Sequence, residues 1–160
     1  MKRDKIDLDG ADRRLLIALQ RDASISQADL AEHAGVSPSQ VSRRLARLKD
    51  EKVLRGVVGV LEPELAGLTC SAIIRVRLRD HAAANVRAFR DLVERMNEVT
   101  LCVMTTGETD YLIKVVARDL PHFQEIVQSK LLRCTAIAHM ESSIILEHLK
   151  NTTALPLDEA

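Results

Sequence analysis

The sequence predicts an α+β protein with two parts: an N-terminal helix-turn-helix domain, winged-helix-like in type, and a C-terminal ferredoxin-like βαββαβ domain. Two observations support this prediction. Three capped amphipathic segments occupy residues 9–50, and strand and helix patterns then follow in the order β-α-β-β-α-β. The chain of 160 residues is long enough for two small domains. We expect the helix-turn-helix domain over residues 1–52, a linker strand and hinge over 53–67, and the βαββαβ domain over 68–160.

Start signals for helices recur three times near the N-terminus. Asp9, Ser26 and Ser37 are each followed, three residues later, by an acid or a glutamine, which is the pattern of a helix N-cap. Gly35 can end the second helix because glycine adopts the left-handed conformation without strain. A helix, a short helix, a turn with glycine and a longer helix form the helix-turn-helix arrangement.

Charge is distributed unevenly along the chain, although the formal net charge is 0. Residues 1–60 hold 12 Lys and Arg against 9 Asp and Glu, a balance of +3, and residues 61–160 hold 11 against 14, a balance of −3. Basic side chains are densest over residues 37–56, on and just after the third predicted helix. Such a local concentration is typical of a nucleic-acid interface.

The third predicted helix has one apolar face and one polar, basic face. Val41, Leu45 and Leu48 recur at the spacing of a buried helical stripe. We predict that the opposite face enters the major groove of double-stranded DNA, where arginine contacts phosphates or guanine. A small helical bundle with a solvated basic face is the alternative. The predicted DNA contacts are Ser37, Ser39, Gln40, Ser42, Arg43, Arg44 and Arg47.

Alternating apolar residues predict the elements of the second domain. The strands are expected over residues 53–61 (in the linker), 71–78, 99–106, 111–117 and 137–149, and the helices over 82–96 and 119–131. Aromatic residues make up only 2% of the chain, namely Phe89, Tyr111 and Phe123. An RNA-recognition module stacks bases on aromatic side chains of its central strands. The low aromatic content therefore argues against RNA binding.

Several other classes of protein are disfavoured. No apolar run approaches the length of a membrane helix, and the N-terminus lacks the pattern of a signal peptide, so we expect a cytoplasmic protein without a membrane partner. The three cysteines lack a Cys-x-x-Cys motif, which indicates reduced thiols; thiol sensing is the minority interpretation. No nucleophile motif, phosphate loop or metal-like histidine spacing occurs, so we predict no catalytic residues, no metal, no cofactor and no enzyme.

Three motifs carry a resemblance to a known family. They are Leu8-Asp9-x-x-Asp12, then Ala34-Gly35-Val36-Ser37-Pro38-Ser39 with its following helix, and Thr106-Gly107-Glu108-Thr109-Asp110-Tyr111-Leu112. Together they resemble the Lrp/AsnC (leucine-responsive regulatory protein / asparagine regulator) family of transcription factors. The resemblance implies homodimers formed through the second domain, which assemble into tetramers or octamers. It also implies an amino acid, or a related small molecule, bound between neighbouring effector domains.

The resemblance also implies where the effector binds. Gly107 would let the backbone approach the ligand and offer N–H groups to its carboxylate, and Asp110 would receive its ammonium group. The alternative is that Gly107 is a turn residue and Asp110 its cap. Met140 stands where relatives often have threonine, and it suits an apolar ligand side chain such as that of leucine or methionine. The implied ligand-binding residues are Thr106, Gly107, Thr109, Asp110, Tyr111, Met140 and Ser142.

Our leading hypothesis is therefore a sequence-specific DNA-binding transcriptional regulator whose assembly or DNA binding responds to an amino acid. An architectural, nucleoid-type DNA-binding protein without a small-molecule response is the alternative. An enzyme built on the ferredoxin-like domain is disfavoured, because the sequence shows no cluster of acid, base or nucleophile.

Overall fold

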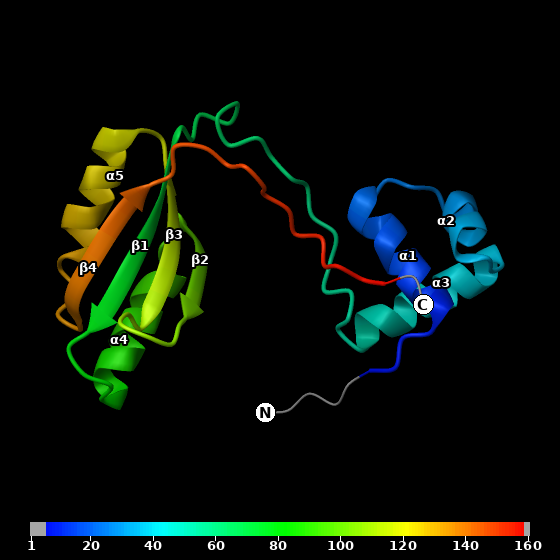
Figure 1. Ribbon diagram of the computed structural model, residues 1–160, viewed down its shortest axis with the longest axis horizontal. Coiled ribbons are helices and arrows are strands. Elements are labelled where there is room, and N and C mark those ends of the chain that lie inside the picture. Colours follow the sequence, from blue (N-terminus) through cyan, green and yellow to red (C-terminus); the bar gives the residue numbers. More distant parts are fainter. Residues whose placement is uncertain (1–5, 159–160) are drawn as a thin grey trace. The chain divides into compact units, whose positions relative to one another are not determined.

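The computed structural model describes residues 6–158, which form two compact units (Figure 1). The first unit ends at Gly59 and resumes at Lys150, and the second comprises Val60–Leu149. The C-terminal segment, residues 150–158, therefore groups with the first unit and not with the βαββαβ domain, where we had expected it. Within the described residues, no helix has both the length and the apolar character needed to cross a membrane.

Three helices build the first unit, and they begin where the sequence predicts. Their bounds are α1 Gly10–Arg21, α2 Gln27–Ala34 and α3 Pro38–Asp50. The side chains of Asp9, Ser26 and Ser37 each accept a hydrogen bond from the backbone N–H three residues later, which satisfies a donor that the helix itself leaves free. Gly35 ends α2 with a φ of 67°, in the left-handed region.

A small aliphatic core holds these helices together. Leu15 of α1, Leu30 of α2 and Val41 of α3 are almost fully buried and belong to one cluster. Because Val41 and Leu48 point inward, α3 is oriented with its polar side outward. This confirms the predicted helix-turn-helix arrangement.

The predicted linker strand over residues 53–61 is wrong. No strand is present there, and Val58 and Val60 are 82% and 88% exposed. Valine and glycine gave this stretch the composition of a strand, but a strand forms only when a neighbour accepts and donates its backbone hydrogen bonds. No neighbouring strand pairs with these residues within the described chain.

The second unit has the element order β-α-β-β-α-β, as predicted. The elements are β1 Cys70–Leu78, α4 Ala83–Glu94, β2 Val99–Met104, β3 Tyr111–Ala117, α5 Leu120–Ile126, its π-helical continuation η1 Val127–Leu131, and β4 Ile137–Ile144. The sheet order is β2-β3-β1-β4, with every neighbouring pair antiparallel. This is the ferredoxin-like topology.

The two faces of this sheet differ. Ile74 and Val76 of β1 and Ile113 of β3 are fully buried on the face that α4 and α5 cover, where they pack with Phe89 (Figure 1). The opposite face, called here the open face, carries the alternate residues of the same strands. These are half-buried or exposed and mix apolar with charged groups: Ile73, Arg75, Arg77, Leu112, Lys114, Val116, Glu141 and Ser143.

The last strand is shorter than predicted. We expected it over residues 137–149, but β4 ends at Ile144. Its partner β1 begins at Cys70, so the last backbone bond joins the N–H of Ile145 to the carbonyl of Ser71 at 2.8 Å. Beyond that point Leu146 and Leu149 are 96% and 90% exposed, because no strand remains to pair with them.

Candidate functional site

The outward face of α3 presents polar groups in its first two turns. Ser39, Gln40 and Arg43 are all exposed there. Among residues 6–158, no hydrogen bond or ion pair is recorded for the guanidinium group of Arg43, so it remains available to a phosphate or a base edge. All three therefore remain accessible, and a DNA contact by each of them stays a prediction.

Four of the predicted DNA contacts, Ser37, Ser39, Gln40 and Ser42, also have hydrogen-bond partners inside the unit; Oγ of Ser39 lies 3.0 Å from Oγ of Ser37. The backbone N–H of Ser37 donates to Oε1 of Gln40 at 3.0 Å, and the N–H of Gln40 donates to Oγ of Ser37 at 3.4 Å, which forms a complete capping box. The hydroxyl of Ser42 donates to Oε1 of Gln27 at 3.2 Å and so ties α3 to α2. A DNA contact by Ser37 or Ser42 stays a prediction, and its first role here is to hold the helix.

Arg44 and Arg47 point to α1 and bind acids inside the unit. Nη1 of Arg44 lies 2.7 Å from Oδ2 of Asp9 and 2.8 Å from Oδ1 of Asp12, and Arg47 pairs with the other oxygen of Asp12. Asp12 is fully buried, whereas Arg47 is 43% exposed. Both guanidinium groups therefore fix α3 against α1. Their predicted DNA contacts remain untested, and of the two Arg47 offers more free surface.

These ion pairs shift the acid–base equilibria of the groups involved. The backbone N–H of Asp12 and then the guanidinium of Arg44 lower the pKa of Asp9, because both stabilise its carboxylate. Hydrogen bonds to Asp9 and Asp12 raise the pKa of Arg44. Both shifts favour the charged forms of Asp9 and Arg44 at neutral pH.

The hairpin between β2 and β3 is the predicted effector loop. Gly107 has a φ of 110°, a conformation that residues with a Cβ rarely adopt. Thr105 closes the hairpin with two hydrogen bonds. Its N–H donates to the carbonyl of Asp110 at 2.9 Å, and its hydroxyl donates to the carbonyl of Thr109 at 2.9 Å. The backbone N–H groups from Thr106 to Thr109 have no recorded partner within the described chain.

Asp110 has a structural partner that the sequence did not reveal. Its Oδ2 accepts the backbone N–H of Leu78 at 2.7 Å, and its Oδ1 lies 3.4 Å from Nε2 of His81. The carboxylate thereby holds the hairpin against the end of β1. This favours the capping alternative for Asp110 over the binding of a ligand ammonium group.

Tyr111 belongs to the core, which corrects its assignment as a ligand contact. Its side chain is 4% exposed, and its ring centroid lies 4.6 Å from that of Phe89 in a tilted arrangement. Met140 is paired in register with Val76, which is paired with Tyr111, so the three side chains share the helix-covered face. Met140 packs against the same core.

The predicted effector residues therefore do not form one pocket in a single chain. Ser142 pairs with Ile74 and is exposed near the end of β4, while the residues of the hairpin lie beyond the start of β3. The two hollows described on the chain lie elsewhere: one on α5 and η1, and one between α1 and α2.

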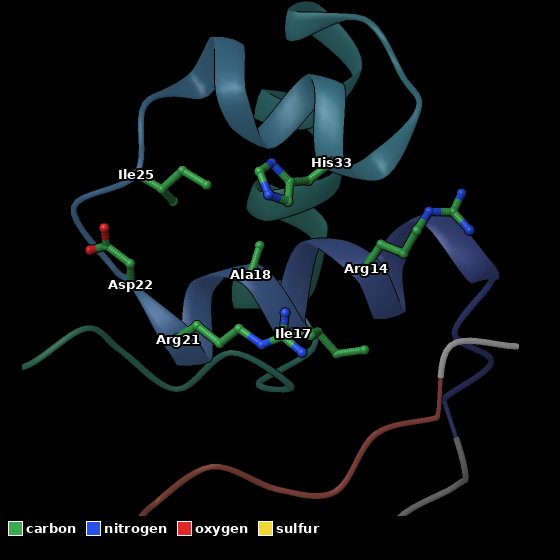
Figure 2. Close-up of a pocket in the computed structure, with 7 residues that line it drawn as sticks. All are labelled: Arg14, Ile17, Ala18, Arg21, Asp22, Ile25 and His33. Atoms are coloured by element: carbon green, nitrogen blue, oxygen red, sulfur yellow. The ribbon is translucent and has the colours of Figure 1, made fainter.

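The hollow between α1 and α2 has a volume of about 320 Å³ and was not predicted (Figure 2). Ile17, Ala18 and Ile25 give it an apolar lining, and Arg14, Arg21, Asp22 and His33 complete it. Arg14 is already engaged, since its Nη2 donates to the carbonyl of Ala34 at 2.9 Å and caps the C-terminal end of α2. The seven-residue spacing of Arg14 and Arg21 on one helix face was the available sequence signal.

No group of three or more potential metal ligands occurs among residues 6–158. The geometry instead defines a class of protein: a helix-turn-helix unit with an outward polar helix, joined to a ferredoxin-like unit, is a DNA-binding regulator with a sensing or assembling domain. Comparison with known families agrees. Residues 8–49 match the AsnC-type helix-turn-helix domain, and residues 71–155 match the Lrp/AsnC ligand binding domain.

The chain belongs to the Lrp/AsnC family of transcriptional regulators, as the sequence motifs indicated. It is 34% identical to the HTH-type transcriptional regulator AldR of Mycolicibacterium smegmatis, over 93% of this chain and 87% of that protein. It is 32% identical to the DNA-binding transcriptional activator DecR of Escherichia coli, over 94% of this chain and 99% of that one. Its relatives are regulators of transcription, and it is likewise a regulator and not an enzyme.

A solved structure agrees over nearly the full length. The crystal structure of a transcriptional regulator from Neisseria meningitidis, determined as a complex with L-Met, superposes with a TM-score of 0.90 at 35% identity. The match covers 95% of this chain and 98% of that chain. The architecture of both units is therefore shared with a regulator that binds an amino acid.

Proposed function

We propose that this chain regulates transcription in response to an amino acid, with an apolar amino acid such as methionine or leucine as the first candidate. The observation that carries the proposal is its likeness, along 95% of its length, to the Neisseria regulator solved with L-Met. The aliphatic environment of Met140 on the helix-covered side of the sheet agrees with an apolar ligand side chain. Because it acts on DNA, we place the protein in the cytoplasm.

The ligand carboxylate would bind the hairpin at residues 106–109. Several backbone N–H groups are free there, and Gly107 leaves space because nothing lies within 4 Å of the position a Cβ would take. Asp110 is occupied by Leu78 and His81, so the ligand ammonium group would need acceptors from another copy of the chain. The proposed effector site is therefore completed only in an assembly.

The open face of the sheet is the surface we propose for the homodimer. Ile73 and Leu112 lie half-buried beside the Arg75–Glu141 pair, whose Nη1 and Oε2 atoms are 3.4 Å apart. Mixed apolar and charged residues of this kind suit an interface between copies, which buries the apolar groups and leaves the charges at the rim. Dimers would then assemble into tetramers or octamers.

One experiment tests these points together. Binding of the full chain to its own upstream DNA is measured with and without each amino acid, at fixed salt, while light scattering records the size of the assembly. An amino acid that changes affinity or assembly size supports the proposal. DNA binding that no amino acid alters would favour the architectural alternative, and a monomer at all concentrations would contradict the proposed dimer.

A further inference from the structure

The side chain of Gln20, in the last turn of α1, binds both backbone groups of Leu155. Oε1 of Gln20 accepts the N–H of Leu155 at 2.6 Å, and Nε2 of Gln20 donates to the carbonyl of Leu155 at 3.2 Å. One side-chain amide thus satisfies a main-chain donor and acceptor together, as a neighbouring strand would.

This contact can form and break readily. Gln20 is exposed and Leu155 is 67% exposed, so water competes for both hydrogen bonds. Each bond therefore adds little to the stability of the docked segment. The hydroxyl of Thr152 accepts the N–H of Ala154 at 3.1 Å, close to Leu155. Neither apolar cluster recorded for residues 6–158 includes a residue of this C-terminal segment.

The position of Leu155 in the chain makes the contact consequential. The last backbone bond of the sheet is at Ile145, ten positions before Leu155. Ten residues span at most about 35 Å, so docking at Gln20 sets an upper limit on the distance between Ile145 and α1. A second segment, or crossing, also links the two units. It begins at Leu54, whose N–H binds the carbonyl of Leu48, and ends fifteen positions later at Thr69, whose N–H binds the carbonyl of Arg118. Its length allows a span of at most about 50 Å.

We propose that residues 146–158, called here the C-terminal strap, form a releasable tether for the DNA-binding unit. With the strap docked on Gln20, the shorter of the two crossings limits how far the helix-turn-helix unit travels from its sheet. With the strap released, only the longer crossing limits it. The number and spacing of the DNA half-sites that one assembly can bind at once then depend on whether the strap is docked.

The consequence for DNA follows from effective concentration. When one unit of an assembly is bound, a second unit finds its half-site with a local concentration that depends on tether length. A short tether gives a steep dependence of affinity on half-site spacing, and a long one gives a flatter dependence. This step rests on the proposed dimer; the docking of the strap does not.

The test compares the full chain with Gln20→Ala and with a chain that ends at Asn151. Gln124→Ala is the matched control, because Gln124 is an exposed helical glutamine of the second unit. Hydrogen exchange first reports whether the strap is docked. The peptide that contains Leu155 should exchange about tenfold faster in Gln20→Ala and at the wild-type rate in Gln124→Ala. Equal exchange in the wild type and Gln20→Ala would overturn the docking.

The second measurement is affinity for DNA with two half-sites at several spacings, alongside DNA with a single half-site. In Gln20→Ala and in the shortened chain, the ratio between the best and the worst spacing should fall by at least about threefold, with single-site affinity unchanged. Faster exchange with an unaltered ratio would overturn the tether. Light scattering in the same samples separates this outcome from a failure of the proposed dimer, which would appear as monomers.

Discussion

Asp12 of α1 and Arg44 of α3 form an ion pair across the helix-turn-helix unit, with Nη1 of Arg44 2.8 Å from Oδ1 of Asp12. Asp12 is fully buried and is the one buried charged side chain recorded for residues 6–158. A buried carboxylate needs such partners, because moving its charge out of water without a compensating partner costs a large free energy. The position of the DNA-reading helix therefore depends on this pair as well as on the aliphatic core.

Asp12→Asn should destabilise the first unit. The substitution keeps the shape of the side chain but leaves Arg44 and Arg47 without their shared buried anion, and we expect a loss of about 2–3 kcal/mol in the free energy of unfolding. Urea unfolding at pH 7 measures it. Asp7→Asn is the control, since Asp7 is exposed, and it should have no effect. A stable Asp12→Asn protein would mean that the core alone fixes α3.

Arg43→Ala and Arg44→Ala should have different consequences. Arg43 is exposed and has no recorded partner, so its removal should weaken DNA binding and leave stability unchanged. The slope of log affinity against log salt concentration should become shallower by about one, because one phosphate contact is lost. Arg44→Ala should lower the free energy of unfolding by about 1–2 kcal/mol, because Asp12 and Asp9 lose a partner.

The measurements are DNA affinity at several salt concentrations and urea unfolding of the same proteins. Assembly size, from light scattering, should stay the same for both variants. If Arg44→Ala unfolded like the wild type and lost DNA affinity as strongly as Arg43→Ala, Arg44 would be a DNA contact with little structural role.

The pair of Glu98 and Lys130 should make stability depend on pH. Oε1 of Glu98 lies 2.6 Å from Nζ of Lys130, and this hydrogen bond lowers the pKa of Glu98 below its ordinary value of 4.5. A carboxyl group with a lowered pKa stabilises the fold above its ordinary pKa and loses that contribution as the pH falls through its folded value.

Lys130→Met should therefore cost about 1 kcal/mol at pH 7, and the difference from the wild type should shrink as the pH falls from 5 toward 3. Urea unfolding across this range measures the difference. Lys49→Met, at an exposed position, is the control and should match the wild type. A difference that stayed constant with pH would show that Lys130 acts through packing and not through its charge.

Gly107→Asp should abolish the amino-acid response and leave the dimer intact. A carboxylate in the hairpin would repel the ligand carboxylate from the free N–H groups. Gly107→Ala is needed beside it, since any side chain is strained at a φ of 110°. Isothermal titration with methionine and leucine measures binding. Gly107→Ala should retain at least part of the binding, and a full response in Gly107→Asp would place the site elsewhere.

Local signals in the sequence were sufficient for most of the fold. N-caps at Asp9, Ser26 and Ser37 fixed the helix starts because capping involves residues only three positions apart. Alternation from Ile113 to Ala117 likewise predicted a strand with one buried face. Interactions between distant residues were out of reach, as with the ion pair of Arg44 and Asp12, which are 32 positions apart.

The structural roles of Tyr111 and Asp110 at the candidate site depend on the same kind of long-range interaction. Tyr111 shares its alternation with Ile113, so the pattern itself places it on the buried face, whereas the resemblance alone implied a ligand contact. The hydrogen bond from the N–H of Leu78 to Asp110 depends on the register between β1 and β3. That register cannot be inferred from the spacing of residues along the chain. The strand predicted at residues 53–61 is not formed, because a composition that favours strands does not provide the neighbouring strand needed for hydrogen bonding.

The first unit is assembled from two stretches of the sequence that lie far apart, since it ends at Gly59 and resumes at Lys150. A fragment cut after Gly59 would lack the residue that Gln20 binds. A DNA-binding unit moved into another member of the family would therefore keep this contact only if both stretches were transplanted together. Changes that alter this half of the protein can arise at either end of the gene.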